Sequence, residues 1–167
     1  MPAQASIRLT VDGEVSAAID IGTVAHDFTF GPNWVMGDGT GANSITKAFT
    51  DTRTLAASAS EDLDLAGSLV DALGQTLTFT KLRAIVIRAA VGNTNNVVVG
   101  GASANALATM FGAATHTLTV RPGGAVALIA PDATGYAVTA GTADLLKVAN
   151  SAGGSAVTYD IVLLGTT

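Results

Sequence analysis

The 167-residue chain contains no cysteine, few charged residues and few aromatic residues. Without cysteine, disulfides and thiolate metal sites are excluded. Charged residues make up 13% of the chain, against about 25% in typical domains, and aromatic residues make up 5%. We therefore expect a core of Val, Ile, Leu and Ala under a surface rich in Thr, Ser, Asn and Gly. Because buried interfaces are depleted in charge, this composition indicates an oligomer or a particle-bound protein.

Basic stretches and long apolar runs are missing as well. The net charge is −5, whereas nucleic-acid binding generally requires a basic stripe, so we expect no nucleic-acid partner. No apolar run approaches the ~20 residues of a membrane-spanning helix, so we expect no membrane partner. The N-terminal stretch MPAQASIRLTVDG lacks the basic start and the apolar core of a secretion signal, which predicts a cytoplasmic location before any assembly.

The apolar residues that are present follow a period of two, which is typical of half-buried strands. From Ile7 to Ile21 they occupy mostly odd positions. The pair Asp12-Gly13 predicts a turn, because a three-residue loop there pairs Leu9 with Val15 and keeps the apolar residues on one face. Gly13 would supply the left-handed position of that loop. Residues 1–30 are therefore predicted to form an N-terminal hairpin or arm, packed on or exchanged with neighbours.

Short strands with Gly, Pro and Asn clusters between them are predicted along the rest of the chain. A Gly-rich surface loop is expected over 31–43, and two helix-like patches, 65–73 and 104–111, are too short to alternate with strands as an α/β fold requires. This pattern predicts an all-β fold, with an antiparallel β-sandwich over 44–167. The expected strands are 25–30, 44–49, 52–58, 76–79, 82–90, 96–101, 116–120, 125–130, 135–140, 145–150 and 157–165.

An acidic cluster in SASEDLDLAGSLVDAL, residues 58–73, is the first candidate for chemistry. Its members are Glu61, Asp62, Asp64 and Asp71. Paired carboxylates serve glycosidases, and several oxygens can bind calcium. However, Asp62 and Asp64 alternate with leucines, as on the wet side of a strand, and the spacing differs from a calcium loop. The pattern favours a solvated strand face, with a subunit or metal contact and catalysis as the alternatives.

No other motif indicates an enzyme. GDGTGAN, residues 37–43, lacks the Lys-Ser/Thr of a phosphate-binding loop and reads as a turn. GASAN, residues 101–105, lacks the final Gly of a serine nucleophile motif. His26 and Asp27 are adjacent, so a strand would turn them to opposite faces, and His116 alternates with apolar residues as an edge histidine facing the core. We expect no catalytic, cofactor-binding or metal-binding residue.

Several residues remain as candidate contacts with a partner protein. Trp34, the single tryptophan, lies near Met36 in the Gly-rich stretch. Core packing is the usual position of a lone tryptophan, and an anchor for a partner is the alternative. The NTNN stretch, residues 93–96, reads as a turn, and its amides could also bind sugars. The predicted partner-contact residues are Arg8, Trp34, Met36, Asn93 and Asn95.

The run GTGAN, followed by DTRTLAASASEDLDLAGSLVDALGQTLTFTKLRAIVIRAAVGNTNNVVVGGA, resembles structural proteins of tailed bacteriophages. The later segments RPGGAVALIAPDATGYAV and DLLKVANSAGGSAVTYDIVLLG are similar to the same group, so the resemblance covers roughly 39–165. It implies a jelly-roll-like sandwich and a head decoration (cementing) protein on the outer capsid surface of the virion. It further implies a homotrimer that binds the major capsid protein. A tail or fibre component that binds a receptor is the alternative.

Overall fold

The computed structural model describes residues 2–167, and within this range the chain forms fourteen strands and no helix. This confirms the predicted all-β class. Among the same residues no helix is long and apolar enough to cross a membrane. The N-terminal strands are β1 (Ala5–Arg8), β2 (Val11–Ile19), β3 (Gly22–Phe30), β4 (Asn33–Asp38) and β5 (Ser44–Ile45). The remaining strands are β6 (Lys47–Leu55), β7 (Ser60–Asp64), β8 (Lys81–Ala89), β9 (Val97–Gly100), β10 (Thr117–Val120), β11 (Ala125–Ile129), β12 (Tyr136–Ala137), β13 (Leu145–Asn150) and β14 (Val157–Thr166).

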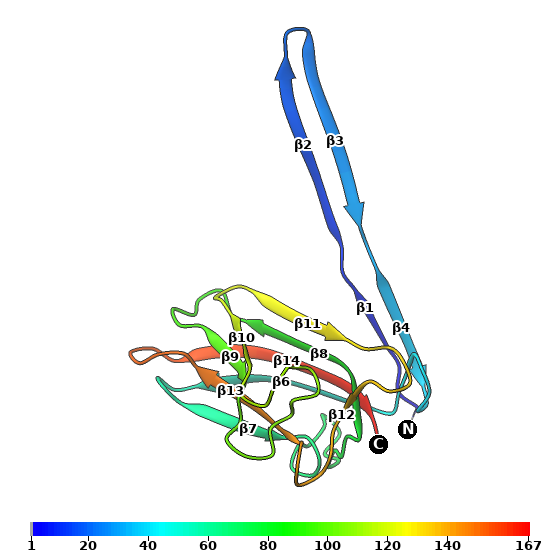
Figure 1. The fold of residues 1–167 in the computed structure, drawn as a ribbon, viewed down its shortest axis with the longest axis vertical. Helices are drawn as coiled ribbons and strands as arrows, with labels where there is room; N and C mark the ends of the chain where they lie inside the picture. The colour runs from blue at the N-terminus through cyan, green and yellow to red at the C-terminus, as the bar shows by residue number, and fades with distance from the viewer. Residues whose placement is uncertain (1) are drawn as a thin grey trace.

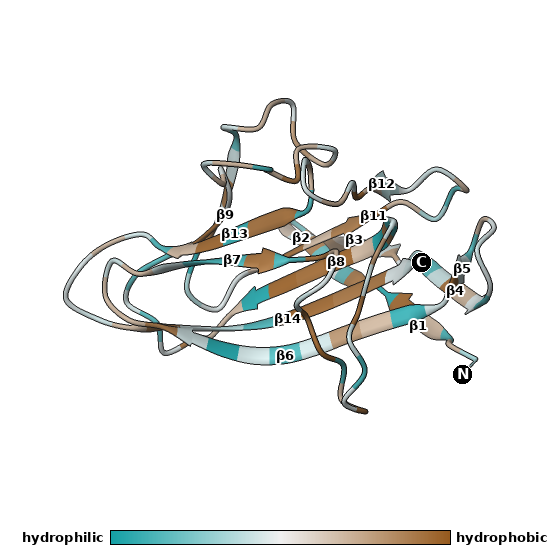
Figure 2. Ribbon diagram, turned by 90° about the horizontal axis from the view of Figure 1, so that it is seen from below, coloured by the Kyte–Doolittle hydropathy of each residue, from teal (hydrophilic) through white to brown (hydrophobic). Residues whose placement is uncertain are grey.

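Two antiparallel sheets pack face to face and form a β-sandwich (Figure 1). One sheet has the order β11-β8-β14-β6, with β12 also paired to β8, and the other has the order β10-β9-β13-β7. The last two strands of the chain, β13 and β14, therefore lie inside the sheets, whereas β6 and β7 lie at their edges. Figure 2 shows long hydrophobic stretches along β8, β13 and β14, each of which has a neighbouring strand on both sides.

The main core lies between the two sheets and follows the period of two along each strand. In β13, Leu146 and Val148 are buried and alternate with half-buried neighbours. In β14, Tyr159, Ile161 and Leu163 point into the same core. The aliphatic core predicted from the composition is thus present, with buried aromatic rings at a few positions.

Several predicted strand boundaries are wrong. The segments 44–49 and 52–58 are mainly one long strand, β6, because β14 pairs with it from Lys47 to Leu55 without interruption. The segment 76–79 is not a strand, although its Leu77 and Phe79 are buried. Its apolar residues fill the core from a loop that bonds to Leu65 and Leu69. A buried loop and a short strand have the same apolar alternation, so the sequence pattern does not distinguish them.

Candidate interaction surface

Strands β1 to β4 form one long two-stranded ribbon that projects from the sandwich (Figure 1). β1 pairs with β4 from Ala5↔Met36 onwards, and β2 pairs with β3 down to Ile19↔Gly22. The two residue numbers of every pair add to the same total in both ladders, so no bulge shifts the register. A backbone hydrogen bond of 3.1 Å from Leu9 to Pro32 joins the two ladders. We call residues 5–38 the arm.

The turn of the arm lies at Asp20-Ile21, so the predicted turn at Asp12-Gly13 is wrong. Gly22 has a φ of 115° and supplies the left-handed backbone that follows the turn. Gly13 instead lies within β2, opposite Phe28. A Cβ atom there would come within 2.3 Å of the Phe28 ring, which shows why this strand position carries glycine. The longer hairpin satisfies more backbone groups than the predicted one, because it extends the ladder over all of β2 and β3.

One face of the arm is apolar along its whole length. Residues opposite one another in an antiparallel pair share a face, so the odd positions of β1 and β2 lie with the even positions of β3 and β4. Large apolar side chains occupy most of these positions, and His26 is the one titratable residue among those paired in the two ladders. From the root outwards, the paired residues of this apolar face are Ala5 and Met36, Ile7 and Trp34, Val11 and Phe30, Gly13 and Phe28, Val15 and His26, Ala17 and Val24, and Ile19 and Gly22.

The opposite face of the arm is polar and acidic. It carries Asp12 opposite Thr29 and Glu14 opposite Asp27, followed by small residues near the turn. Between residues 9 and 32 the chain has four acidic residues and no Lys or Arg. Arg8 lies at the base of this face, exposed and paired with Asn33. The predicted contact residue Arg8 is therefore on the surface, on the polar side of the arm.

The root of the arm is packed against the outer face of one sheet of the sandwich. Met36 and Trp34 belong to a second apolar cluster with Ala84 of β8 and Leu164 of β14. Met36 is 1% exposed, so it is a core residue and not a surface contact as predicted. Trp34 is half-buried in the same cluster. The stretch 31–43 is accordingly not one loop, because Asn33–Asp38 form β4 and only 39–43 connect it to β5.

A buried arginine holds the Gly-rich connection in place. Arg83 of β8 is fully buried. Its donors reach the backbone carbonyl oxygens of Thr40 and Gly41 (both 3.0 Å), Ser44 (3.3 Å) and Asp132. Nothing in the apolar pattern of this strand indicates the role of Arg83, because the carbonyls that bind it lie far along the chain. These hydrogen bonds fix the connection that follows β4, and with it the root of the arm, to the sandwich. We call Arg83 and the carbonyl groups that it binds the Arg83 socket.

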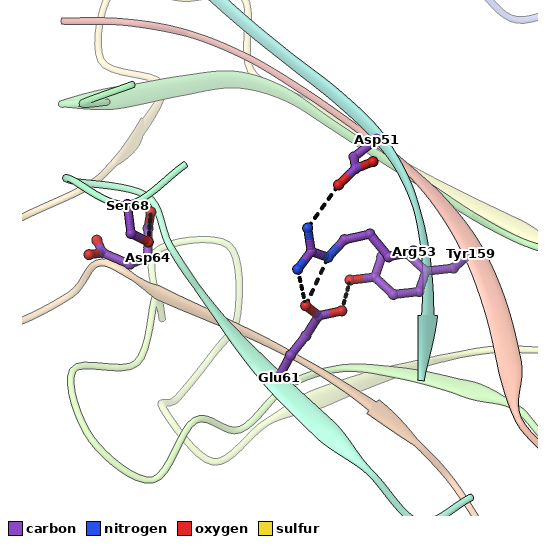
Figure 3. A network of polar contacts seen from close by, with 6 residues as sticks. All are labelled: Asp51, Arg53, Glu61, Asp64, Ser68 and Tyr159. Atoms are coloured by element: carbon purple, nitrogen blue, oxygen red, sulfur yellow. Dashed lines mark hydrogen bonds and ion pairs between the residues drawn. The ribbon is translucent and has the colours of Figure 1, made fainter. Parts of the chain in front are cut away.

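Glu61 of the acidic cluster bridges the two sheets at their β6 and β7 edges (Figure 3). Arg53 Nε donates to Glu61 Oε2 at 2.8 Å, and the Tyr159 hydroxyl donates to Glu61 Oε1 at 2.7 Å. Arg53 also donates to Asp51 at 2.8 Å. Hydrogen bonding to Glu61 raises the pKa of Arg53 above its usual range, and burial, reinforced by Glu61, raises the pKa of Tyr159. Both partners hold their protons at neutral pH, so the network acts as an inter-sheet clamp.

The other carboxylates of the cluster are exposed or form turns, as predicted for a solvated strand face. Asp62 is exposed on β7. Asp64 accepts a hydrogen bond from the Ala66 backbone at 2.9 Å, and Asp71 accepts from Leu73 and Gln75 at 2.9 and 2.8 Å. Among residues 2–167 no group of three or more potential ligands could hold a metal ion. The cluster therefore divides into one clamp residue, one exposed residue and two turn residues.

The amide side chains of the NTNN stretch are bound within the chain. Asn93 exchanges two hydrogen bonds with the backbone of Thr158, at 2.8 and 2.9 Å. Asn95 Nδ2 lies 3.0–3.2 Å from oxygens of Asn150 and of the 152–155 turn. The stretch lies in the connection between β8 and β9, as expected for a non-strand segment. The predicted contact residues Asn93 and Asn95 tie this connection to β14 and to the 150–155 segment.

The two histidines lie in different parts of the molecule. His26 is exposed on the apolar face of the arm, opposite Val15. His116 is exposed immediately before β10, so the prediction that it faces the core is wrong. Most of the large apolar side chains that are exposed among residues 2–167 lie in the arm. Comparisons with protein-family models, curated proteins and solved structures gave no match.

Proposed function

We propose that this chain is a non-enzymatic structural protein of a tailed-phage virion. In this proposal it is a head decoration (cementing) protein that binds the major capsid protein on the outer surface of the head as a homotrimer. The observation that carries the proposal is the apolar face of the arm, which is packed on the sandwich at its root and exposed beyond it. Large exposed apolar surfaces mark sites of protein–protein interaction.

We also infer that the sandwich is a jelly roll. Its eight main strands, β6 to β11 with β13 and β14, divide equally between the two sheets. The last two strands return to the middle, β13 between β7 and β9 and β14 between β6 and β8. Such returns are the mark of Greek-key connections, and a jelly roll combines two of them. Jelly rolls are common in viral capsid proteins, which favours the virion proposal.

The chemistry of the acidic cluster favours a structural role over an enzymatic one. Glu61 is engaged by both Arg53 and Tyr159, and Asp71 is engaged by two backbone N–H groups. A carboxylate that serves as a general base needs a free oxygen directed at a substrate. A depression of about 640 Å³ beside β6 includes Lys47 and Asp71 in its lining, and Asp71 uses Oδ1 to hold the 71–75 turn.

A decoration protein stabilises a shell by binding the assembled state more tightly than the separate subunits. Many copies act together, so modest contacts at each copy add up through multivalency. The sandwich provides a rigid base for these contacts, and the arm extends the contact surface away from the sandwich.

Binding to heads tests the proposal. In an arm-less variant, residues 9–32 are replaced by Asn-Gly, which closes a two-residue hairpin between the paired residues Arg8 and Asn33. The purified chain is mixed with heads of the phage that encodes it, stripped of their own copies, and sedimented. We expect the wild-type chain, but not the arm-less variant, to sediment with the heads, and we expect gold-labelled antibody to mark the heads of intact virions. Label on the tails, or no co-sedimentation, would overturn the proposal in favour of the tail alternative or of a role outside the virion.

A further inference from the structure

We infer that the apolar face of the arm packs against the same face of other copies of this chain, with the arms parallel around a common axis. The inference rests on the proposed oligomeric decoration protein and adds the surface through which its copies meet. It names a second copy of this chain, and not the shell, as the occupant of the face.

The exposed part of the face is large enough for a stable interface. Eight of the twelve large apolar side chains exposed among residues 2–167 lie in the arm beyond its root, and they are 42–93% exposed. Together they offer on the order of 800 Å², which is what each partner buries in a standard interface. These residues are Leu9, Val11, Val15, Ile19, Ile21, Val24, Phe28 and Phe30.

The side chains of the face alternate in size in a way that suits contact with copies of itself. Of the four cross-strand pairs of the face nearest the tip, three combine a larger residue with a small one: Phe28 with Gly13, Val24 with Ala17, and Ile19 with Gly22. Interdigitating large and small side chains is how two apolar sheet faces reach close packing. When the arms are parallel, each cross-strand pair lies at the same height as the identical pair of the neighbouring copy. The contact between large and small side chains is therefore repeated along the axis.

The charges of the arm favour the same arrangement. Asp12, Glu14 and Asp27 all lie on the polar face, and like charges repel when they are brought together. Packing through the apolar face directs these carboxylates away from the axis and into solvent. It places His26 on the side of the arm that faces the axis.

Continuity along the arm also points to a second copy. At the root, the same face is already buried against the sandwich of its own chain. Beyond the root, an isolated two-stranded hairpin is only marginally stable in water. A second copy of the chain carries the same exposed face, and closed symmetry covers such a face without leading to open-ended aggregation.

A pair of neighbouring substitutions tests which face is used. Val15→Asp places a charge on the apolar face, and Ser16→Asp places the same charge on the polar face one residue away. The solution mass of each full-length chain is measured by size exclusion with light scattering. We expect wild type and Ser16→Asp to be multimers and Val15→Asp to be a monomer. A monomeric wild type, or equal masses for the two variants, overturns the inference.

Cross-linking tests the geometry, since the chain has no cysteine of its own. Ala17 lies on the apolar face and Ala18 on the polar face, so Ala17→Cys should give disulfide-linked dimers on mild oxidation and Ala18→Cys should not. Ile21→Cys, at the tip, should also cross-link, because only parallel arms bring their tips together. Equal cross-linking at positions 17 and 18, or none at position 21, contradicts the arrangement.

The two proposals fail in different ways. A multimer that does not sediment with heads retains the arm-to-arm inference and rejects the decoration function. A monomeric wild-type chain that binds heads, and loses this binding on Val15→Asp, retains the function and rejects the inference, because the shell then occupies the face.

Discussion

At the scale of single residues, buried polar groups tie distant segments together. Arg83 is fully buried, and its hydrogen-bond partners are backbone carbonyls from two loops. Glu61 accepts from two residues of the opposite sheet. Burying a charge is costly unless hydrogen bonds replace its hydration. Hydrogen bonds replace the hydration of both Arg83 and Glu61. Substituting either residue would leave its partners without a hydrogen bond and should lower the free energy of unfolding.

Arg83→Met keeps most of the side-chain volume and removes every donor. The carbonyl oxygens of Thr40, Gly41, Ser44 and Asp132 would lose their buried partner, so we expect a loss of about 3 kcal/mol or more in the free energy of unfolding. Urea denaturation measures it. The control is Arg88→Met on the same strand, where the side chain is 64% exposed and 3.9 Å from Asp160. The control should change stability by less than about 0.5 kcal/mol, and equal losses in the two variants would contradict the socket role.

The raised pKa of Tyr159 should make the free energy of unfolding depend on pH in alkaline solution. Burial, reinforced by the hydrogen bond to Glu61, raises its pKa in the folded chain. The unfolded chain then loses this proton above about pH 10 while the folded chain keeps it, so the free energy of unfolding falls as pH rises, with a limiting slope of about 1.4 kcal/mol per pH unit. Below that pH the contribution is fully present.

Denaturation at a series of pH values from neutral to alkaline, compared with Tyr159→Phe, measures this contribution. The variant should be less stable at neutral pH, because Glu61 loses a donor, and its alkaline decline should be shallower. Tyr136→Phe serves as the matched control and should retain the wild-type slope. An unchanged slope in Tyr159→Phe would show that another group causes the decline.

At the scale of elements, β14 is the central strand that joins β6 to β8 in one sheet. It pairs with β6 along nine residues and with β8 along most of its length, and the β8 register shifts between Leu164 and Gly165. At this irregularity the backbone of Lys81 approaches closely. A Cβ atom on Gly165 would lie 2.2 Å from the Lys81 carbonyl oxygen and 2.7 Å from the Phe79 ring. Glycine is therefore required here by contact between backbones.

Gly165→Ala should lower the free energy of unfolding by about 1–3 kcal/mol, because the clash involves backbone and cannot be relieved by turning a side chain. Gly92→Ala is the control, since a Cβ atom there meets nothing within 4 Å and surface substitutions of this kind stay within about 0.5 kcal/mol. Chemical denaturation of both variants gives the comparison. A Gly165→Ala chain as stable as Gly92→Ala would show that β14 can shift without cost.

At the scale of the whole molecule, a two-sheet sandwich carries a long arm whose root is packed against it. The second apolar cluster and the Arg83 socket hold that root, while the arm beyond Arg8 and Asn33 extends away from the body (Figure 1). The sandwich buries its own main core, so its stability should not depend on the part of the arm beyond the root. That part has no core of its own and, in the inferred arm-to-arm packing, gains one through association.

This division predicts a concentration-dependent melting temperature. Association stabilises the folded state by mass action, so the melting temperature of the wild-type chain should rise with protein concentration. In the arm-less variant, with 9–32 replaced by Asn-Gly, it should be independent of concentration. Scanning calorimetry over a hundredfold range of concentration checks both chains. A concentration-dependent melting temperature in the arm-less variant would place the interface on the sandwich.

The amino-acid sequence by itself determined the all-β class and most strands of the sandwich. The alternation around β8, β13 and β14 is local, and a strand with one or two buried faces needs that pattern wherever its partners lie. The same alternation correctly assigned Asp62 to the solvent side. The turn preference of Asn, which is also local, placed the NTNN stretch between two strands. It also indicated an apolar face on the N-terminal segment, since odd positions from Ile7 to Ile19 are mostly apolar.

Only the tertiary structure decided where the arm turns, what its root covers and which of its residues remain exposed. Asp12-Gly13 and Asp20-Ile21-Gly22 both satisfy local turn chemistry, and the choice depends on the ladder between β2 and β3 and on the Phe28 ring over Gly13. Met36 and Arg83 became buried through contacts with residues far along the chain. Strand order and burial are sums over such long-range contacts, whereas the periodicity of a sequence records only which side of a strand each residue takes.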